Sequence, residues 1–132
     1  MKKILRYWIP FGAILIGIFL FSSTPDYELK KIEFPFAHLI GHIVAYFLMG
    51  FLLCRALTWK FPLDAKHRAF IKPILISAAC VLIYAISDEW HQSYVPGRNS
   101  TVSDVLLDLF SGIAGAATTI LYRPWANRLK KH

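Results

Sequence analysis

The sequence predicts an all-α membrane protein, a bundle of four transmembrane helices, and three observations support this fold class. Hydrophobic residues make up 56% of the chain and charged residues only 17%, whereas about a quarter of the residues in a soluble domain are charged. The mean hydropathy is accordingly high, at +0.47. Four apolar runs approach or reach the length of about 20 residues that a helix needs to cross a bilayer. The 132 residues are enough for one domain over 1–132 and not for two.

The first two runs predict helices over roughly 4–23 and 36–56. The run ILRYWIPFGAILIGIFLFSS has the basic start and apolar middle of a signal peptide, but no small-x-small cleavage site follows it, and its apolar part is long. A retained helix is therefore favoured over a cleaved leader. The run FAHLIGHIVAYFLMGFLLC contains no Asp, Glu, Lys or Arg, only two histidines.

The last two runs predict helices over roughly 73–92 and 103–122. The run PILISAACVLIYAIS reaches spanning length only if the helix continues through Asp88 as far as Gln92. The run VLLDLFSGIAGAATTILY contains Asp108 and two glycines, Gly112 and Gly115, that allow a second helix to approach closely. That second helix belongs either to the same bundle or to another copy of the chain.

The distribution of positive charge predicts that both termini lie in the cytoplasm. Twelve of the fifteen lysines and arginines precede the first helix, lie between the second and third, or follow the fourth, and such residues collect on the cytoplasmic side. Topology therefore accounts for the net charge of +7, and we expect no nucleic-acid partner. Cys54 and Cys80 fall away from the outer face, so we expect no disulfide.

The segment SDEWHQSYVPGRNSTVSD, residues 87–104, is strongly polar between apolar runs. At about 100° per residue, three predicted helices each have a polar stripe on one face. The helix over 73–92 has Tyr84, Asp88, Glu89, His91 and Gln92 there. The helix over 103–122 has Asp104 and Asp108, and the helix over 36–56 has His38 and His42. With a rise of about 1.5 Å per residue, His42 and Asp108 lie roughly 10 Å below the outer surface. Polar groups at membrane depth satisfy one another only inside a bundle. The sequence thus predicts a polar pocket in the outer leaflet.

The residue types in this pocket indicate two kinds of role. The candidates for catalysis, through proton transfer, are Glu89, His42, Asp88 and Asp104. The candidates for substrate binding are Arg98, Gln92, His91, Asp108 and Tyr84. Among these, Arg98 has the planar guanidinium that suits a phosphate group.

Each candidate also has a purely structural interpretation. Asp108 is equally explained as a hydrogen-bonding group between packed helices, and Arg98 as the partner of Glu89 or Asp104. The spacing His38-x-x-x-His42 can place two imidazoles on one metal ion, but zinc would need a further ligand such as Glu89 or Asp104. Because no other Cys or His pattern supports a metal, we predict two independently hydrogen-bonded histidines, no metal and no cofactor.

Three motifs resemble those of the VanZ-like membrane protein family. They are FSSTP, GHIVAYFLMG and, most specifically, SDEWHQSYVPGRNSTVSDVLLDLFSGIAGA, which is similar to the family's DE-x-x-Q, P-G-R and S-x-x-D series. The resemblance covers most of the chain from Phe21 to Ala117. The family's characteristic residues correspond to His42, Asp88, Glu89, Gln92, Arg98 and Asp104. Asp108 is a departure, because family members often have asparagine there.

The resemblance implies a small multi-pass protein of the bacterial plasma membrane, and a family member is associated with low-level resistance to the glycopeptide teicoplanin. It implies no particular reaction. Our first hypothesis is that the pocket binds or acts on an envelope lipid or lipid-linked cell-wall precursor, with membrane lipids as partners and a phosphate or pyrophosphate head group near Arg98. A structural or partner-binding protein is the alternative. A small proton-coupled transporter is less favoured, because the acidic residues cluster in one leaflet.

Overall fold

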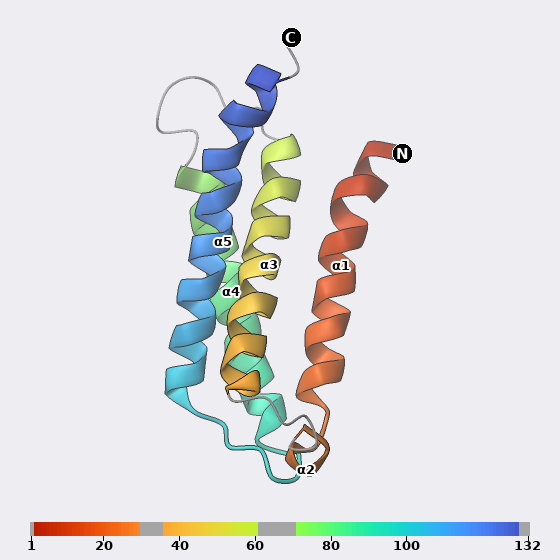
Figure 1. Ribbon diagram of the computed structural model, residues 1–132, viewed down its shortest axis with the longest axis vertical. Helices are drawn as coiled ribbons and strands as arrows, with labels where there is room; N and C mark the ends of the chain where they lie inside the picture. Colours follow the sequence, from red (N-terminus) through yellow and green to blue (C-terminus); the bar gives the residue numbers. More distant parts are fainter. Residues whose placement is uncertain (1, 30–35, 61–70, 130–132) are drawn as a thin grey trace.

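Four long helices lie along one another in the computed structural model (Figure 1). They are α1 (Lys2–Ser22), α3 (Ala37–Lys60), α4 (Ile71–Gln92) and α5 (Val102–Leu129), and a short helix, α2 (Asp26–Leu29), follows α1. The structure describes residues 2–29, 36–60 and 71–129, and the side chains of 4–29, 36–58 and 71–122. Within these residues, each long helix contains a stretch long and apolar enough to cross a membrane, at 4–22, 37–58, 71–92 and 102–122. The predicted fold class is confirmed.

The helices alternate in direction, as consecutive membrane crossings require. α1 and α4 run one way and α3 and α5 the other, so that α1 begins and α5 ends at the same end of the bundle (Figure 1). Several basic residues behind the predicted orientation, such as Lys66 and Arg68, lie outside the described residues. A cytoplasmic location of the termini therefore stays a prediction.

Two features of the helices differ from the helices predicted from the apolar runs. α3 continues to Lys60 and α5 to Leu129, because a helix keeps its backbone hydrogen bonds after it leaves the apolar layer. The connection after α1 contains the single turn of α2, in which the Pro25 carbonyl accepts hydrogen bonds from the amides of Glu28 and Leu29, at 3.0 and 3.3 Å.

The contact between α3 and α5 is the most intimate in the bundle. A Cβ atom on Gly50 would overlap the carbonyl of Gly112, and one on Gly115 would overlap the carbonyl of Phe47. Beside this contact, the Thr119 hydroxyl donates to the Phe51 carbonyl at 2.9 Å. Lipid provides no hydrophobic force between helices, so close packing of small residues holds them together. Gly112 and Gly115 thus pack within the chain.

The helix α1 is bound less tightly than the others. It packs mainly against α3 and much less against α4, and only Ile18 and Ser22 of its described side chains are buried. Large apolar side chains such as Ile9, Ile16 and Leu20 are about three-fifths exposed. In a membrane protein such a surface faces lipid.

The connection between α4 and α5 is fixed by a turn and a helix cap. Gly97 has a φ of +79°, which glycine adopts without strain, in the turn at Pro96-Gly97. The Pro96 carbonyl accepts a hydrogen bond from the Asp26 amide at 3.3 Å, so this turn also holds α2. Thr101 caps α5, with its hydroxyl 3.2 Å from the amide of Asp104.

The glycine contact gives a paired test of the packing. We expect Gly115→Ala to destabilise the bundle by about 1–3 kcal/mol, the usual cost of forcing extra atoms into a packed interior. Gly12→Ala is the control, because nothing lies within 4 Å of a Cβ there and alanine is about 0.5–1 kcal/mol better than glycine in a helix. Thermal unfolding in detergent measures both, and equal effects of the two substitutions would contradict the packing.

The orientation is testable with reporter fusions in a bacterial host. We expect green fluorescent protein fused after His132 to fluoresce and alkaline phosphatase fused there to be inactive, because both report a cytoplasmic terminus. The same phosphatase inserted at Asn99, between α4 and α5, serves as the periplasmic control. Active phosphatase at the C-terminus would show the opposite orientation.

Candidate functional site

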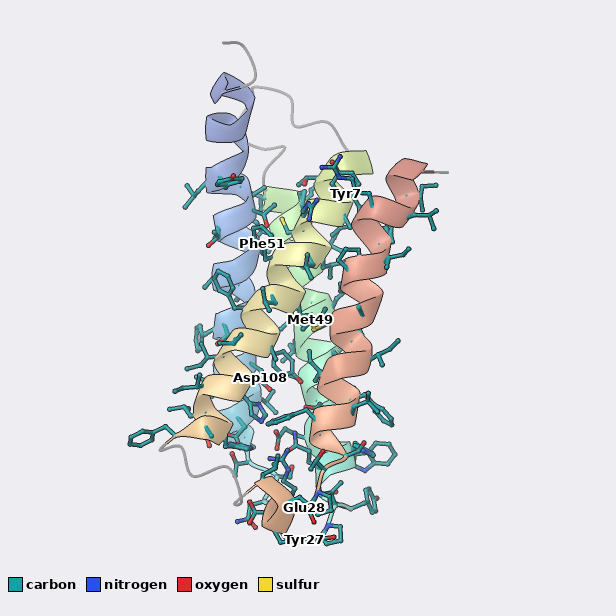
Figure 2. All side chains as sticks on the ribbon, turned by 45° about the vertical axis from the view of Figure 1, so that its right-hand side comes forward. Tyr7, Tyr27, Glu28, Met49, Phe51 and Asp108 are labelled. Atoms are coloured by element: carbon teal, nitrogen blue, oxygen red, sulfur yellow. The ribbon has the colours of Figure 1, made fainter. Side chains whose placement is uncertain are left out.

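Polar side chains from all four long helices gather at the end of the bundle that carries α2 (Figure 2). The buried members are Ser22, His42, Asp88, Glu89, Gln92, Arg98 and Asp108, each at most 9% exposed. Burial of this many polar groups is costly unless they are paired with one another or with a ligand. Their individual partners therefore decide what the site can do.

His42 on α3 and Asp108 on α5 form the deepest pair. The His42 Nδ1 atom lies 2.9 Å from Asp108 Oδ1, and Asp108 is fully buried. An ionised carboxylate only accepts hydrogen bonds, so Nδ1 carries the proton when Asp108 is charged. The other ring nitrogen, Nε2, lies 3.2 Å from Nε2 of His38. His38 and His42 are thus in contact, and His42 is also hydrogen-bonded to Asp108 of α5.

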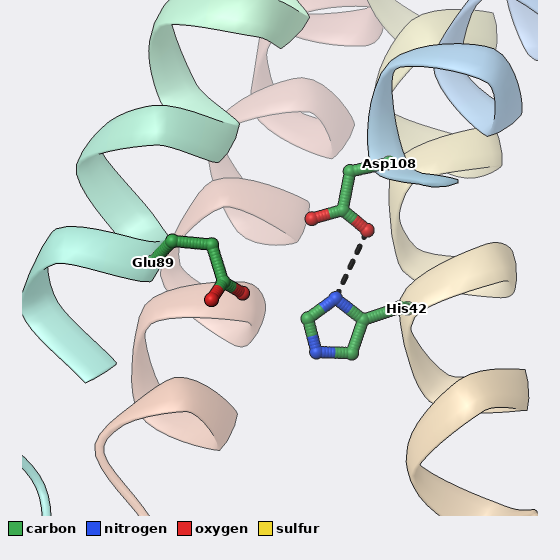
Figure 3. Close-up of side chains that lie close together, drawn as sticks. All are labelled: His42, Glu89 and Asp108. Atoms are coloured by element: carbon green, nitrogen blue, oxygen red, sulfur yellow. Dashed lines mark hydrogen bonds and ion pairs between the residues drawn. The ribbon is translucent and has the colours of Figure 1, made fainter. Parts of the chain in front are cut away.

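Glu89 faces this pair from α4 (Figure 3). Its Oε2 atom accepts a hydrogen bond from the Thr101 amide at 2.9 Å, which ties α4 to the start of α5. One ligand atom each from His42, Glu89 and Asp108 lies within 4.8 Å of the other two. Among the described residues, neither Glu89 Oε1 nor Asp108 Oδ2 has a hydrogen-bond partner.

Asp88, the neighbour of Glu89, has a different environment. Its Oδ2 atom accepts hydrogen bonds from the Tyr46 hydroxyl at 3.1 Å and from Gln92 Nε2 at 3.0 Å. Gln92 also lies 3.4 Å from the Ser22 hydroxyl. Asp88 and Gln92 therefore connect α1, α3 and α4, which is a structural role.

Arg98 lies in the connection after α4 and reaches α1. Its Nη2 atom donates to the Phe21 carbonyl at 3.2 Å, and its guanidinium lies 5.5 Å from the centre of the Phe21 ring. Burial lowers the pKa of Arg98, although four carboxylates oppose the shift. Its Nε and Nη1 atoms have no hydrogen-bond partner in the described part of the chain. Arg98 thus keeps two donor nitrogens for a further acceptor.

Three other predicted site residues have partners away from this centre. His91 stacks on Phe19, 5.0 Å between ring centres, and its Nε2 atom lies 3.0 Å from the Ser23 hydroxyl. The Tyr84 hydroxyl donates to the Leu15 carbonyl at 2.8 Å. Asp104 accepts from the Thr101 hydroxyl at 2.8 Å. His91 and Tyr84 help to line a separate cavity of about 380 Å³.

Sequence reasoning missed four contributors, namely Tyr46, Ser22, Phe21 and Thr101. Tyr46 had a usable signal, since it follows His42 by one helical turn on the same face. Ser22 and Phe21 belong to the FSSTP motif, but their contacts with Gln92 and Arg98 depend on how α1 is docked. Thr101 contributes through its backbone amide, which no side-chain pattern reveals.

A cavity of about 780 Å³ lies between α1 and α3, beside this polar centre. Its apolar wall includes Ile14, Val44 and Leu48. Its polar end is formed by Ser22, Asp26, His38, His42, Tyr46 and Asp88. The cavity therefore joins apolar surface at membrane depth to the predicted site.

Comparison with known proteins agrees with the motifs. A family model described as VanZ/LLP1 matches residues 3–123, which include all four spanning stretches and every residue of the site. Neither the curated proteins nor the solved structures give a match. With this match over nearly its whole length and four apolar helices, the chain belongs to the VanZ/LLP1 family and is a multi-pass membrane protein.

Proposed function

We propose that this protein binds, and acts on, an envelope lipid or lipid-linked cell-wall precursor in the outer leaflet of a bacterial plasma membrane. The cavity between α1 and α3 is the observation that carries the proposal. Its apolar wall suits an acyl or prenyl chain, and its polar end, with His38, His42 and Asp88, suits a head group. Ligand sites generally combine an apolar lining with a few placed polar groups in this way.

Arg98 favours a head group that carries phosphate or pyrophosphate. Its Nε and Nη1 atoms lack partners among the described residues, and each can donate a hydrogen bond to a phosphate oxygen. Phe21 links Arg98 to the cavity, because its ring lines the cavity and lies under the guanidinium. His42 and Glu89, which are able to exchange protons, lie at the same end of the bundle.

A purely structural role explains only part of the cluster. Asp88, Gln92, Tyr46 and Ser22 bond to one another across three helices, as in a cross-link. The atoms without partners on Glu89, Arg98 and Asp108 stabilise nothing within the described residues, and leaving buried polar atoms unsatisfied is unfavourable. Those three residues favour a ligand over a cross-link.

The role of Arg98 is testable by lipid retention. We expect wild-type protein purified in mild detergent to retain a phosphate-bearing lipid. Arg98→Gln should retain at least about tenfold less of it, because hydrogen bonds to charged groups contribute about 1.5–3 kcal/mol. Native mass spectrometry measures the bound lipid. Arg55→Gln is the matched control, since Arg55 also lies over an aromatic ring of α1, 4.9 Å from the centre of Tyr7, but at the other end of α3.

Equal retention by the two arginine variants would contradict the proposed head-group site.

The same proposal predicts a cellular effect, because a protein that handles precursors at the outer face acts where a glycopeptide acts. Cells that express Arg98→Ala or Glu89→Ala at unchanged membrane abundance should lose tolerance to teicoplanin, whereas Arg55→Gln should keep it. Full tolerance in both alanine variants would refute the link to resistance.

A further inference from the structure

We propose that His42, Glu89 and Asp108 form a binding site for a divalent transition-metal ion, with zinc as the first choice. The three residues come from α3, α4 and α5, and one ligand atom from each lies within 4.8 Å of the others (Figure 3). Their side chains are at most 4% exposed. This site goes beyond the proposed lipid function and does not depend on it.

Two buried oxygen atoms without partners point to a cation. Glu89 uses Oε2 to accept from the Thr101 amide, and Asp108 uses Oδ1 to contact His42. The remaining oxygens, Glu89 Oε1 and Asp108 Oδ2, have no hydrogen-bond partner among the described residues. A buried acceptor without a partner costs about 1–3 kcal/mol, and more when it is charged. A cation between the two carboxylates would satisfy both oxygens at once.

The charges of the three groups match a divalent ion. Two carboxylates supply two negative charges and a neutral imidazole supplies none, so an ion of charge +2 makes the site neutral. Neutrality is valuable here, because an uncompensated charge at membrane depth is costly. An imidazole together with carboxylates suits zinc, manganese or iron better than magnesium or calcium, which prefer oxygen ligands alone.

The geometry requires only a small closure. Zinc binds nitrogen and oxygen ligands at about 2.0–2.2 Å. In a tetrahedral site, neighbouring ligand atoms are then about 3.3–3.6 Å apart. The three ligand atoms, at separations of up to 4.8 Å, would have to approach by about 1.5 Å at most, which rotations within the Glu89 side chain can supply. Three protein ligands leave one tetrahedral position for water or a ligand oxygen, as in catalytic zinc sites.

Zinc binding by the full-length protein in detergent tests the site. After the protein is treated with EDTA and dialysed against buffer in which Zn²⁺ is the only added metal, we expect one zinc ion per chain by inductively coupled plasma mass spectrometry. Glu89→Gln and Asp108→Asn should lower the zinc affinity at least about a hundredfold, because substitution of residues that only hydrogen-bond to metal ligands already lowers affinity about 10–100-fold. Glu28→Gln, which changes an exposed carboxylate on α2, is the matched control. His38→Gln should retain zinc.

Two measurements on wild-type protein do not depend on how the variants fold. Zn²⁺ should raise the melting temperature and EDTA should reverse the rise, because a ligand of the folded state stabilises it. Co²⁺ in place of zinc should give the strong visible absorption of a four-coordinate site. The proposal would be overturned if the wild-type protein bound no zinc and its melting temperature did not change with Zn²⁺. Retention of zinc by Glu89→Gln with loss in His38→Gln would overturn it too, and would place the ion on the two histidines.

Discussion

The close backbone contact between α3 and α5 determines the geometry of the polar site. Gly50 and Gly115 bring the two helices together so closely that a methyl group added to either would overlap a carbonyl of the other helix. α3 and α5 run in the same direction, so the first residues of both lie at the end of the bundle that carries α2 (Figure 1). His42 and Asp108 lie toward those ends and meet at 2.9 Å. Small residues, whose side chains have no hydrogen-bonding groups, thus hold His42 and Asp108 in place.

Adjacent carboxylates in one motif have separate roles because successive residues of a helix point about 100° apart. Asp88 turns toward Tyr46 and Gln92 and is satisfied there. Glu89 turns toward α5, bonds the amide of Thr101 with one oxygen and keeps the other without a partner among the described residues. In the proposed site, Asp88 would fix the helices and Glu89 would remain available for a ligand.

Much of the fold could be predicted because the apolar runs and the polar stripes are independent signals. The runs indicated four spanning helices, and the rise per residue placed His42 and Asp108 at one depth, where the structure joins them. The partners of Arg98 could not be predicted in this way. Its contacts run to the backbone and ring of Phe21, and they depend on how α1 is docked. His91 was on the predicted polar face but near its edge, and it turns toward Phe19.

The few polar contacts of α1 have a consequence for the order of assembly. Tyr84, Gln92 and Arg98 donate to Leu15, Ser22 and Phe21, so each of these partners is made about seventy residues later than the part of α1 that it holds. During synthesis α1 therefore enters the membrane before the groups that fix it exist. Its apolar side chains tolerate that interval in lipid. The end of α1 next to α2 gains these polar contacts only when α4 and the following turn have been made.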